Sequence, residues 1–280
     1  MKLAVTAILG LCLMIPSLWH LSTSRKLALA QERLHYKPSY EALYFSSLDH
    51  QLLMSELLFF EASFYYGAIA AKKKQKPDNA MLLQYLDTAT RLNPYNIDAH
   101  YFGQAILTWD AGMVKEMNAI LERGVEKRSW DFYLPFFLGF NYSYFLNNYE
   151  KAAAYTAIAA RRKPQAGFLP TLASRLYYEA DKTDQAISYL KVVLAGSNNE
   201  MLRRSLVARL TALESIAFLE KAAKEFKSRT GRSPRELSEL VVARILKAIP
   251  PDPYGGTFYL DNRDGRVKTT SKMSTSGAKK

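Results

Sequence analysis

The sequence FFLGFNY at residues 136–142, followed by NYEKA at 148–152, has the composition of two helices joined by a short turn. Gly139 lies among large aromatic residues, and a small residue, Ala152, follows the polar turn. Two antiparallel helices approach closely where one of them carries Gly or Ala, and an aromatic side chain from the other fills the remaining space. The stretch therefore predicts a tightly packed helical hairpin.

Small residues recur at similar intervals on both sides of this hairpin. Gly103 precedes Gly139 by 36 residues, Ala119 precedes Ala152 by 33, and Ala186 follows Ala152 by 34. A period near 34 residues is typical of helical hairpins that stack and bury their apolar faces against their neighbours. The middle of the chain is therefore expected to be a helical repeat array.

Proline ends the second helix in two of these units. Pro94 and Pro164 are 70 residues apart, which is two periods of 35. Each follows a helical segment and ends it, because proline cannot continue a helix. The combination of glycine and aromatics, a small residue and a closing proline resembles the tetratricopeptide repeat. This resemblance implies an all-α superhelix of antiparallel helix pairs. Its clearest units are residues 97–132, which form the longest unit, 133–166 and 167–200.

Further segments surround the repeat array. A helix at Leu48–Lys72 is expected to open the first repeat, and a helix at 201–227 is expected to cap the last. The predicted order is a signal anchor at 1–24, a linker at 25–46, the repeat domain at 47–227, a helix and β-hairpin at 228–269, and a disordered basic tail at 270–280.

An uncharged apolar run begins directly after Met1 and Lys2. The nineteen residues Leu3–Leu21 carry no formal charge and would span about 28 Å as a helix. This length is close to the hydrocarbon thickness of a bilayer, and the basic residues Arg25 and Lys26 follow it. The run therefore predicts a transmembrane helix that contacts the membrane through residues 3–21.

The same run permits two alternatives to an anchor, a cleaved secretory peptide and a buried helix of a soluble protein. A cleaved secretory peptide would have its apolar core at Leu3–Ile15 and a cleavage site near 22–24 or 28–30. Basic residues after the span favour a cytoplasmic body, whereas the short basic start of the chain favours export. We expect an uncleaved single-pass anchor in a bacterial inner membrane, with the body in the periplasm.

The tail begins with a helix-start pattern. Ser233 precedes Pro234 and is followed three residues later by Glu236, which predicts an N-cap with proline in the first turn. The Pro-Pro-Asp-Pro run at 250–253 then excludes helix. We expect this helix to lie at Leu237–Ile249.

Two short alternating segments follow. Thr257–Leu260 and Arg266–Thr269 predict strands, and the turn residues at 262–265 join them as a hairpin that docks on the preceding helix. The succession of Gly-Arg-x-Pro, Pro-x-Asp-Pro-x-Gly and a tyrosine-bearing strand resembles the C-terminal region of type II secretion major pseudopilins, over about 35 residues. Residues 1–30 lack the glutamate-bearing prepilin helix of a pilin subunit, so the resemblance implies shared local structure.

Three carboxylates of the tail have two interpretations. Asp252, Asp261 and Asp264 offer the oxygen ligands that calcium prefers, as in pseudopilin tails. Turn chemistry explains the same residues without an ion, because Asp accepts hydrogen bonds from nearby backbone N–H groups. We expect no metal and no cofactor.

Composition excludes several classes of protein. With 49% hydrophobic residues and 12% aromatics, the chain is not disordered over most of its length. One cysteine excludes an internal disulfide framework and a multi-cysteine zinc site. The 38 basic and 26 acidic residues give a net charge of +12, and residues 200–280 hold 17 of the basic and 9 of the acidic ones. Such a basic end suits an anionic surface or a solvated helix face.

Motifs of catalysis and nucleic-acid recognition are absent from the sequence. There is no Gly-x-Ser-x-Gly, His-Glu-x-x-His or phosphate-binding loop, and no nucleic-acid-reading motif. We therefore expect a non-catalytic scaffold that does not bind nucleic acid. The alternative is an envelope-polymer enzyme, or an accessory subunit of one, without a recognisable catalytic motif.

Repeat solenoids bind partners on the concave surface formed by their successive first helices. We expect a protein or peptide partner in this groove, such as one used in envelope assembly or in secretion or pilus-type machinery, and we expect the groove residues to be exposed. The predicted groove residues are Tyr101, Trp109, Asn141, Tyr144, Arg175 and Tyr178.

Overall fold

The computed structural model describes residues 37–71, 76–261 and 263–271, together with positions 16, 17, 19, 34 and 273. These residues are mostly helical, with one small two-stranded sheet, so the predicted all-α class is confirmed. They belong to two compact units, Met1–Arg128 and Ser129–Lys280, where the sequence predicted one repeat domain at 47–227. The predicted anchor at 3–21 lies almost wholly outside the described residues.

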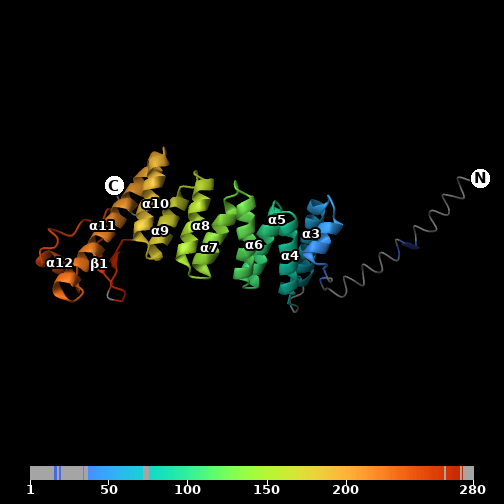
Figure 1. Ribbon diagram of the computed structural model, residues 1–280, viewed down its shortest axis with the longest axis horizontal. Coiled ribbons are helices and arrows are strands. Elements are labelled where there is room, and N and C mark those ends of the chain that lie inside the picture. The colour runs from blue at the N-terminus through green and yellow to red at the C-terminus, as the bar shows by residue number, and fades with distance from the viewer. Residues whose placement is uncertain are drawn as a thin grey trace, which may run out of the picture. The chain divides into compact units, whose positions relative to one another are not determined.

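The first unit contains two helical hairpins preceded by a short helix, which lies within the predicted linker. Side-chain caps fix where helices begin: the carboxylate of Asp78 accepts a hydrogen bond from the N–H of Met81, and Asn96 does the same for Ala99. In Figure 1 these helices lie side by side. They are α2 (Tyr40–Ser46), α3 (Gln51–Ala70), α4 (Asn79–Leu92), α5 (Ile97–Gly103), η1 (Gln104–Asp110) and α6 (Val114–Lys127).

The helix that opens the second hairpin changes character along its length. It is α-helical from Ile97 to Gly103 and continues to Asp110 as a π-helix, η1. A π-helical turn holds more residues than an α-helical turn. This wider turn lies in the longest of the predicted units, at 97–132.

The second unit contains two further hairpins and a long helix. Consecutive helices pack against each other along the unit, and Asn148 and Asn199 cap α8 and α11. The long helix α11 corresponds to the predicted capping helix at 201–227. The helices are α7 (Tyr133–Tyr144), α8 (Tyr149–Arg162), α9 (Phe168–Glu179), α10 (Thr183–Gly196) and α11 (Glu200–Thr230).

The helices keep the spacing expected of repeats. The second helices of the hairpins begin at residues 79, 114, 149 and 183, which are 35, 35 and 34 residues apart. The fourth residue of each is fully buried; these residues are Leu82, Met117, Ala152 and Ala186. The assignment of Ala119 to this position is wrong: Ala119 is exposed, and Met117 lies against Gly103 instead. A shift of two residues turns a side chain by about 200°, to the other side of a helix.

Gly139 lies at the contact between α7 and α8. A side chain there would meet the Thr156 side chain and would come within 3.2 Å of the Ala152 carbonyl oxygen. Because a backbone atom forms part of this wall, the helix pair cannot accommodate a larger residue without separating.

Gly139→Leu should lower the free energy of unfolding by about 1–3 kcal/mol or more, because it overpacks this contact. Gly196→Leu, in the last position of α10, is the matched control, since a side chain there meets nothing within 4 Å. Urea unfolding followed by circular dichroism compares the two variants. Equal stability of both would contradict a close α7–α8 contact at Gly139.

The tail contains α12 (Ser238–Val242) and the strands β1 (Phe258–Leu260) and β2 (Val267–Thr269). The strands pair antiparallel, with Phe258 opposite Thr269, and both fall within the predicted segments. The predicted helix start at Ser233 is wrong. The carboxylate of Glu239 accepts hydrogen bonds from the Arg235 N–H and from the Arg232 side chain, so residues before α12 form bends.

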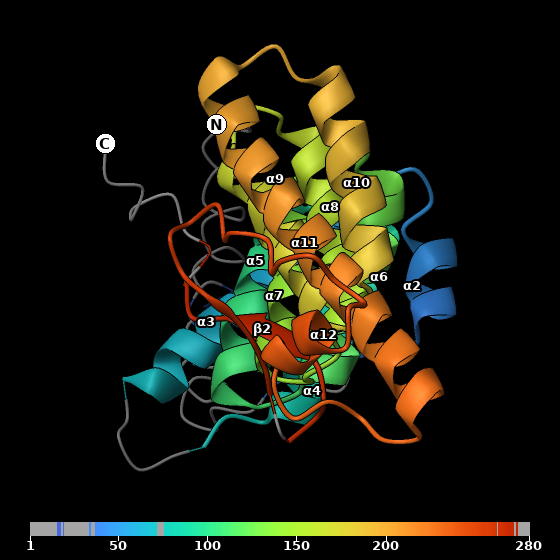
Figure 2. The same cartoon turned by 90° about the vertical axis from the view of Figure 1, so that its left-hand side faces the viewer.

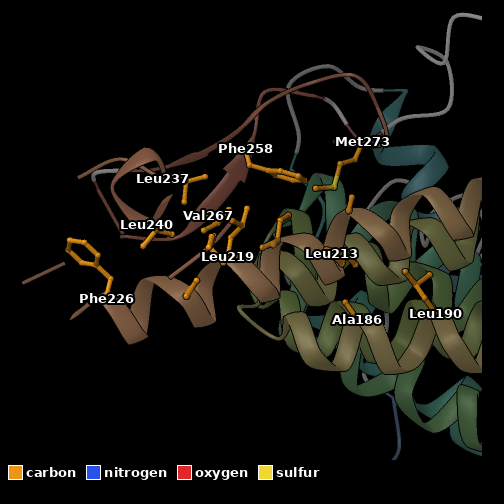
Figure 3. Packing of buried hydrophobic residues seen from close by; sticks show 14 of the residues in the cluster. Ala186, Leu190, Leu213, Leu219, Phe226, Leu237, Leu240, Phe258, Val267 and Met273 are labelled. Carbon is orange, nitrogen blue, oxygen red and sulfur yellow. The ribbon is translucent and has the colours of Figure 1, made fainter. Parts of the chain in front are cut away.

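The hairpin packs mainly on the long helix. Its residues Phe258 and Val267 join one apolar cluster with Leu213 and Leu219 of α11, and Leu237 and Leu240 contribute from the α12 region (Figure 3). Figure 2 shows α12 and β2 lying over α11. The predicted docking site at 237–249 is therefore only part of the surface that the hairpin covers.

The folded tail also extends past its predicted end at residue 269. The N–H of Thr270 donates to the carbonyl of Thr257, and Met273 is buried in the same apolar cluster. Residues 274–280 lie outside the described part of the chain.

Deletion of residues 250–280 should increase hydrogen exchange in α11 at 213–226 as well as at 237–246, because it uncovers both walls of the cluster. Hydrogen exchange with mass spectrometry measures this change. Deletion of 274–280 alone is the control and should leave both regions protected. Unchanged protection of α11 in the longer deletion would exclude the hairpin as its cover.

Candidate functional site

Two predicted groove residues belong to the first unit. Tyr101, in α5, is half-buried, and Trp109, in η1, is 53% exposed. The next residue, Asp110, accepts a hydrogen bond from the Tyr66 hydroxyl of α3, and this bond raises the pKa of Tyr66 to about 12. This hydrogen bond holds the end of the π-helix, next to Trp109, against α3.

Two more predicted residues lie on α7, in the second unit. Tyr144 is 63% exposed and stacks on Phe140, with ring centroids 5.2 Å apart. The prediction of Asn141 as a groove residue is wrong, because its side chain is fully buried. Asn141 follows the buried Leu138 by three residues and therefore lies on the packed face of the helix.

The last two predicted residues, Arg175 and Tyr178 of α9, line one pocket. The Tyr178 hydroxyl donates to the Val267 carbonyl at 3.0 Å, and the guanidinium of Arg266 lies 4.8 Å from the ring centroid. Burial raises the pKa of Tyr178 to about 12. The tail of the same chain therefore covers Tyr178, while Arg175 remains exposed.

Two adjoining pockets meet at a pair of arginines. One has a volume of about 470 Å³ and the other about 510 Å³, and both are lined by Arg175, Arg209 and Met273. The larger pocket lies between α9 and α11, and its apolar wall includes Phe168 and Leu172. Together they form what we call the arginine pocket.

Arg209 has an unusual environment. It is only 4% exposed, and its guanidinium donates hydrogen bonds to the Met273 carbonyl and to the Tyr254 side chain. Among the residues that the structure describes, none is a hydrogen-bond partner of its Nε–H. Burial lowers the pKa of Arg209, and the neighbouring charge of Arg175 acts in the same direction. Within the described ranges, no Asp or Glu forms an ion pair with Arg209.

A buried guanidinium without a counter-ion is costly, since its desolvation is not offset by an opposite charge. A ligand that brought an anionic group would supply this charge. Carboxylates match a guanidinium through two parallel hydrogen bonds, and the apolar wall would accept a hydrocarbon group beside them. The pocket is therefore suited to a ligand with a carboxylate next to an apolar group.

The sequence analysis identified Arg175 but missed Arg209. The signal was present in the spacing along α11: Arg209 follows Leu206 by three residues and precedes Leu213 by four, and both leucines are fully buried. A charged residue in the apolar stripe of a helix departs from the expected pattern. Such departures occur most often at functional sites.

The tail carboxylates have internal partners. The ammonium of Lys268 donates to Asp261 and to Asp264 at 2.7 Å each, and Asp252 accepts from the Tyr254 N–H at 2.8 Å. Hydrogen bonds from Arg263 and Lys268 lower the pKa of Asp261. A lysine thus occupies the position between two of the three carboxylates considered for calcium. Among the described residues, no group of His, Cys, Asp and Glu side chains could hold a metal ion.

Within the part of the chain that the structure describes, one helix has the length and apolar composition needed to cross a membrane. This helix is α3, and 22% of its apolar stretch is buried inside the structure.

A scan against models of protein families finds no match, and a search of curated proteins finds no similar sequence.

Arg209→Met should leave the free energy of unfolding within about 1 kcal/mol of the original or raise it, because an apolar residue removes the desolvation cost of the charge. Leu206→Ala, at a neighbouring buried position of the same helix, is the reference and should cost about 2–5 kcal/mol. Urea titration measures both. A loss as large as that of Leu206→Ala would show that Arg209 is structural and would argue against a ligand site.

Proposed function

We propose that this protein is a non-catalytic scaffold of tetratricopeptide type that binds a segment of a partner protein at the arginine pocket. The observation that carries this proposal is the buried Arg209, which has no acidic partner in the described structure and lines the same cavity as the exposed Arg175. The spacing of 34–35 residues between successive second helices supports the repeat class.

The partner segment would place a carboxylate against Arg175 and Arg209 and an apolar side chain against Phe168. Arginine and aromatic residues dominate the binding energy of many protein interfaces. Tyr144, which is exposed on α7 in the same unit, and the exposed Trp109 of the first unit are further candidate contacts.

The location belongs to the same proposal. The uncharged run at 3–21 supports a single-pass anchor in a bacterial inner membrane, and the short basic start supports a periplasmic body. The tail pattern, which resembles that of major pseudopilins, supports a role in envelope assembly or in secretion or pilus-type machinery.

The lining of the arginine pocket favours binding over catalysis. Among the described residues that line it, the one carboxylate, Glu179, lies 3.7 Å from the Arg175 guanidinium, and there is neither His nor Cys. Arginine itself does not act readily as an acid or base, because it stays protonated. The enzyme alternative therefore has less support than the scaffold.

Site-specific photo-cross-linking in intact cells tests the scaffold. Benzoylphenylalanine at Phe168, on the pocket wall, should form an adduct with a protein partner, and the adduct should fall at least tenfold when Arg175→Glu reverses the charge beside it. The same photo-reactive residue at Val242, which is 83% exposed on α12, is the control. Adducts of equal yield at both sites, or adducts insensitive to Arg175→Glu, would contradict the proposal.

A further inference from the structure

Helix α3 is apolar on two opposite sides. One side packs within the first unit through the buried residues Ser55, Leu58, Ala62 and Ile69. The other side exposes large apolar side chains. Leu53 is 58% exposed, Leu57 52%, Phe60 47% and Phe64 72%. We call these four residues the α3 stripe.

The stripe is continuous along the helix. At about 100° per residue its four members fall within about 60° of one another, on the side opposite the buried face. Phe60 and Phe64 stack on each other, with centroids 5.9 Å apart and planes 17° apart. The small exposed residues Gly67 and Ala71 continue the same side toward the end of the helix. No charged side chain interrupts it, because Glu56 and Glu61 lie at its edges.

A soluble helix normally presents polar residues on the side away from its core. A contiguous exposed apolar surface instead indicates a contact with another apolar phase. Among the described helices, α3 is also the one long and apolar enough to cross a membrane. Its buried face, however, packs against other helices of the first unit.

The chain itself indicates which apolar phase covers the stripe. The uncharged run at 3–21 ends only 18 residues before α2, and 18 residues extend over at most about 65 Å. If this run is the anchor proposed above, α3 is held close to the bilayer surface, where its effective concentration against lipid is high. Basic residues follow α3 in the sequence, including the exposed Lys76, and attract anionic headgroups.

We propose that α3 lies flat on the membrane surface with the stripe Leu53, Leu57, Phe60 and Phe64 inserted among the lipid chains. Helices that lie in the interface in this way bury leucine and phenylalanine about 5–10 Å below the headgroups and keep basic residues near the lipid phosphates. The contact is separate from the arginine pocket, which belongs to the second unit.

Depth-dependent quenching tests the contact in the full-length protein. The single cysteine is first removed by Cys12→Ser. Leu57→Cys and Phe64→Cys then place a nitrobenzoxadiazole dye on the stripe. Ala70→Cys is the matched control, because residue 70 is also exposed on α3 but lies about 100° away around the helix. The proteins are reconstituted in vesicles of phosphatidylethanolamine and phosphatidylglycerol.

Brominated lipid chains should quench the two stripe dyes at least threefold more than the control dye, and aqueous iodide should show the reverse order. Equal quenching at all three positions would overturn the proposal. Disulfide formation between two copies of the Leu57→Cys variant, with no quenching by brominated lipid, would overturn it in favour of a second copy as the cover.

Flotation of the vesicles separates this result from that of the anchor. A protein that floats with the vesicles but shows no lipid quenching on the stripe retains its anchor and refutes the α3 contact. Lipid quenching on the stripe after deletion of 1–24 supports the contact even if the anchor proposal fails. Partner cross-linking at Phe168 is unaffected in either case.

Discussion

The distance between the two helices of a hairpin is the constraint on which the repeat structure depends. At Gly139 this distance is so short that an added side chain would meet the backbone of α8. Successive second helices begin at nearly constant intervals, so the seventh residue of a first helix returns to the corresponding place in the next hairpin. A buried serine, Ser174, stands 35 residues after Gly139 and shows that the position tolerates a small polar residue as well as glycine.

Small residues made much of the fold predictable, because the need for them at a close contact is visible in the sequence. The same reasoning failed at Ala119, since a flexible methionine can fill the space beside Gly103. Asn141 was placed in the groove because it lies on a first helix of the array, whereas its amide is buried on the packed face of that helix. The docking of the hairpin had no local signal: Tyr178 and Val267 are 89 residues apart in the chain.

Two features of this chain depart from what a stable soluble fold requires. Arg209 places a charge where α11 needs an apolar residue, and α3 places apolar residues where water is expected. Both departures are costly in the isolated chain, and each would be relieved by the contact proposed for it: an anion for the arginine and lipid for the helix. The sequence alone marks each position as an exception to the expected pattern. The structure adds a pocket beside Arg209 and an exposed face on α3, and these indicate the kind of contact that each position suits.

The bond between Arg209 and the carbonyl of Met273 also affects the order of folding. These residues are 64 positions apart, and contacts between distant residues form late because closing a long loop is entropically costly. During synthesis, α11 is complete before Met273 has been added to the chain. Arg209 can therefore reach its partner only after the C-terminal segment has been added, and Met273 is the last described residue of the pocket lining to leave the ribosome.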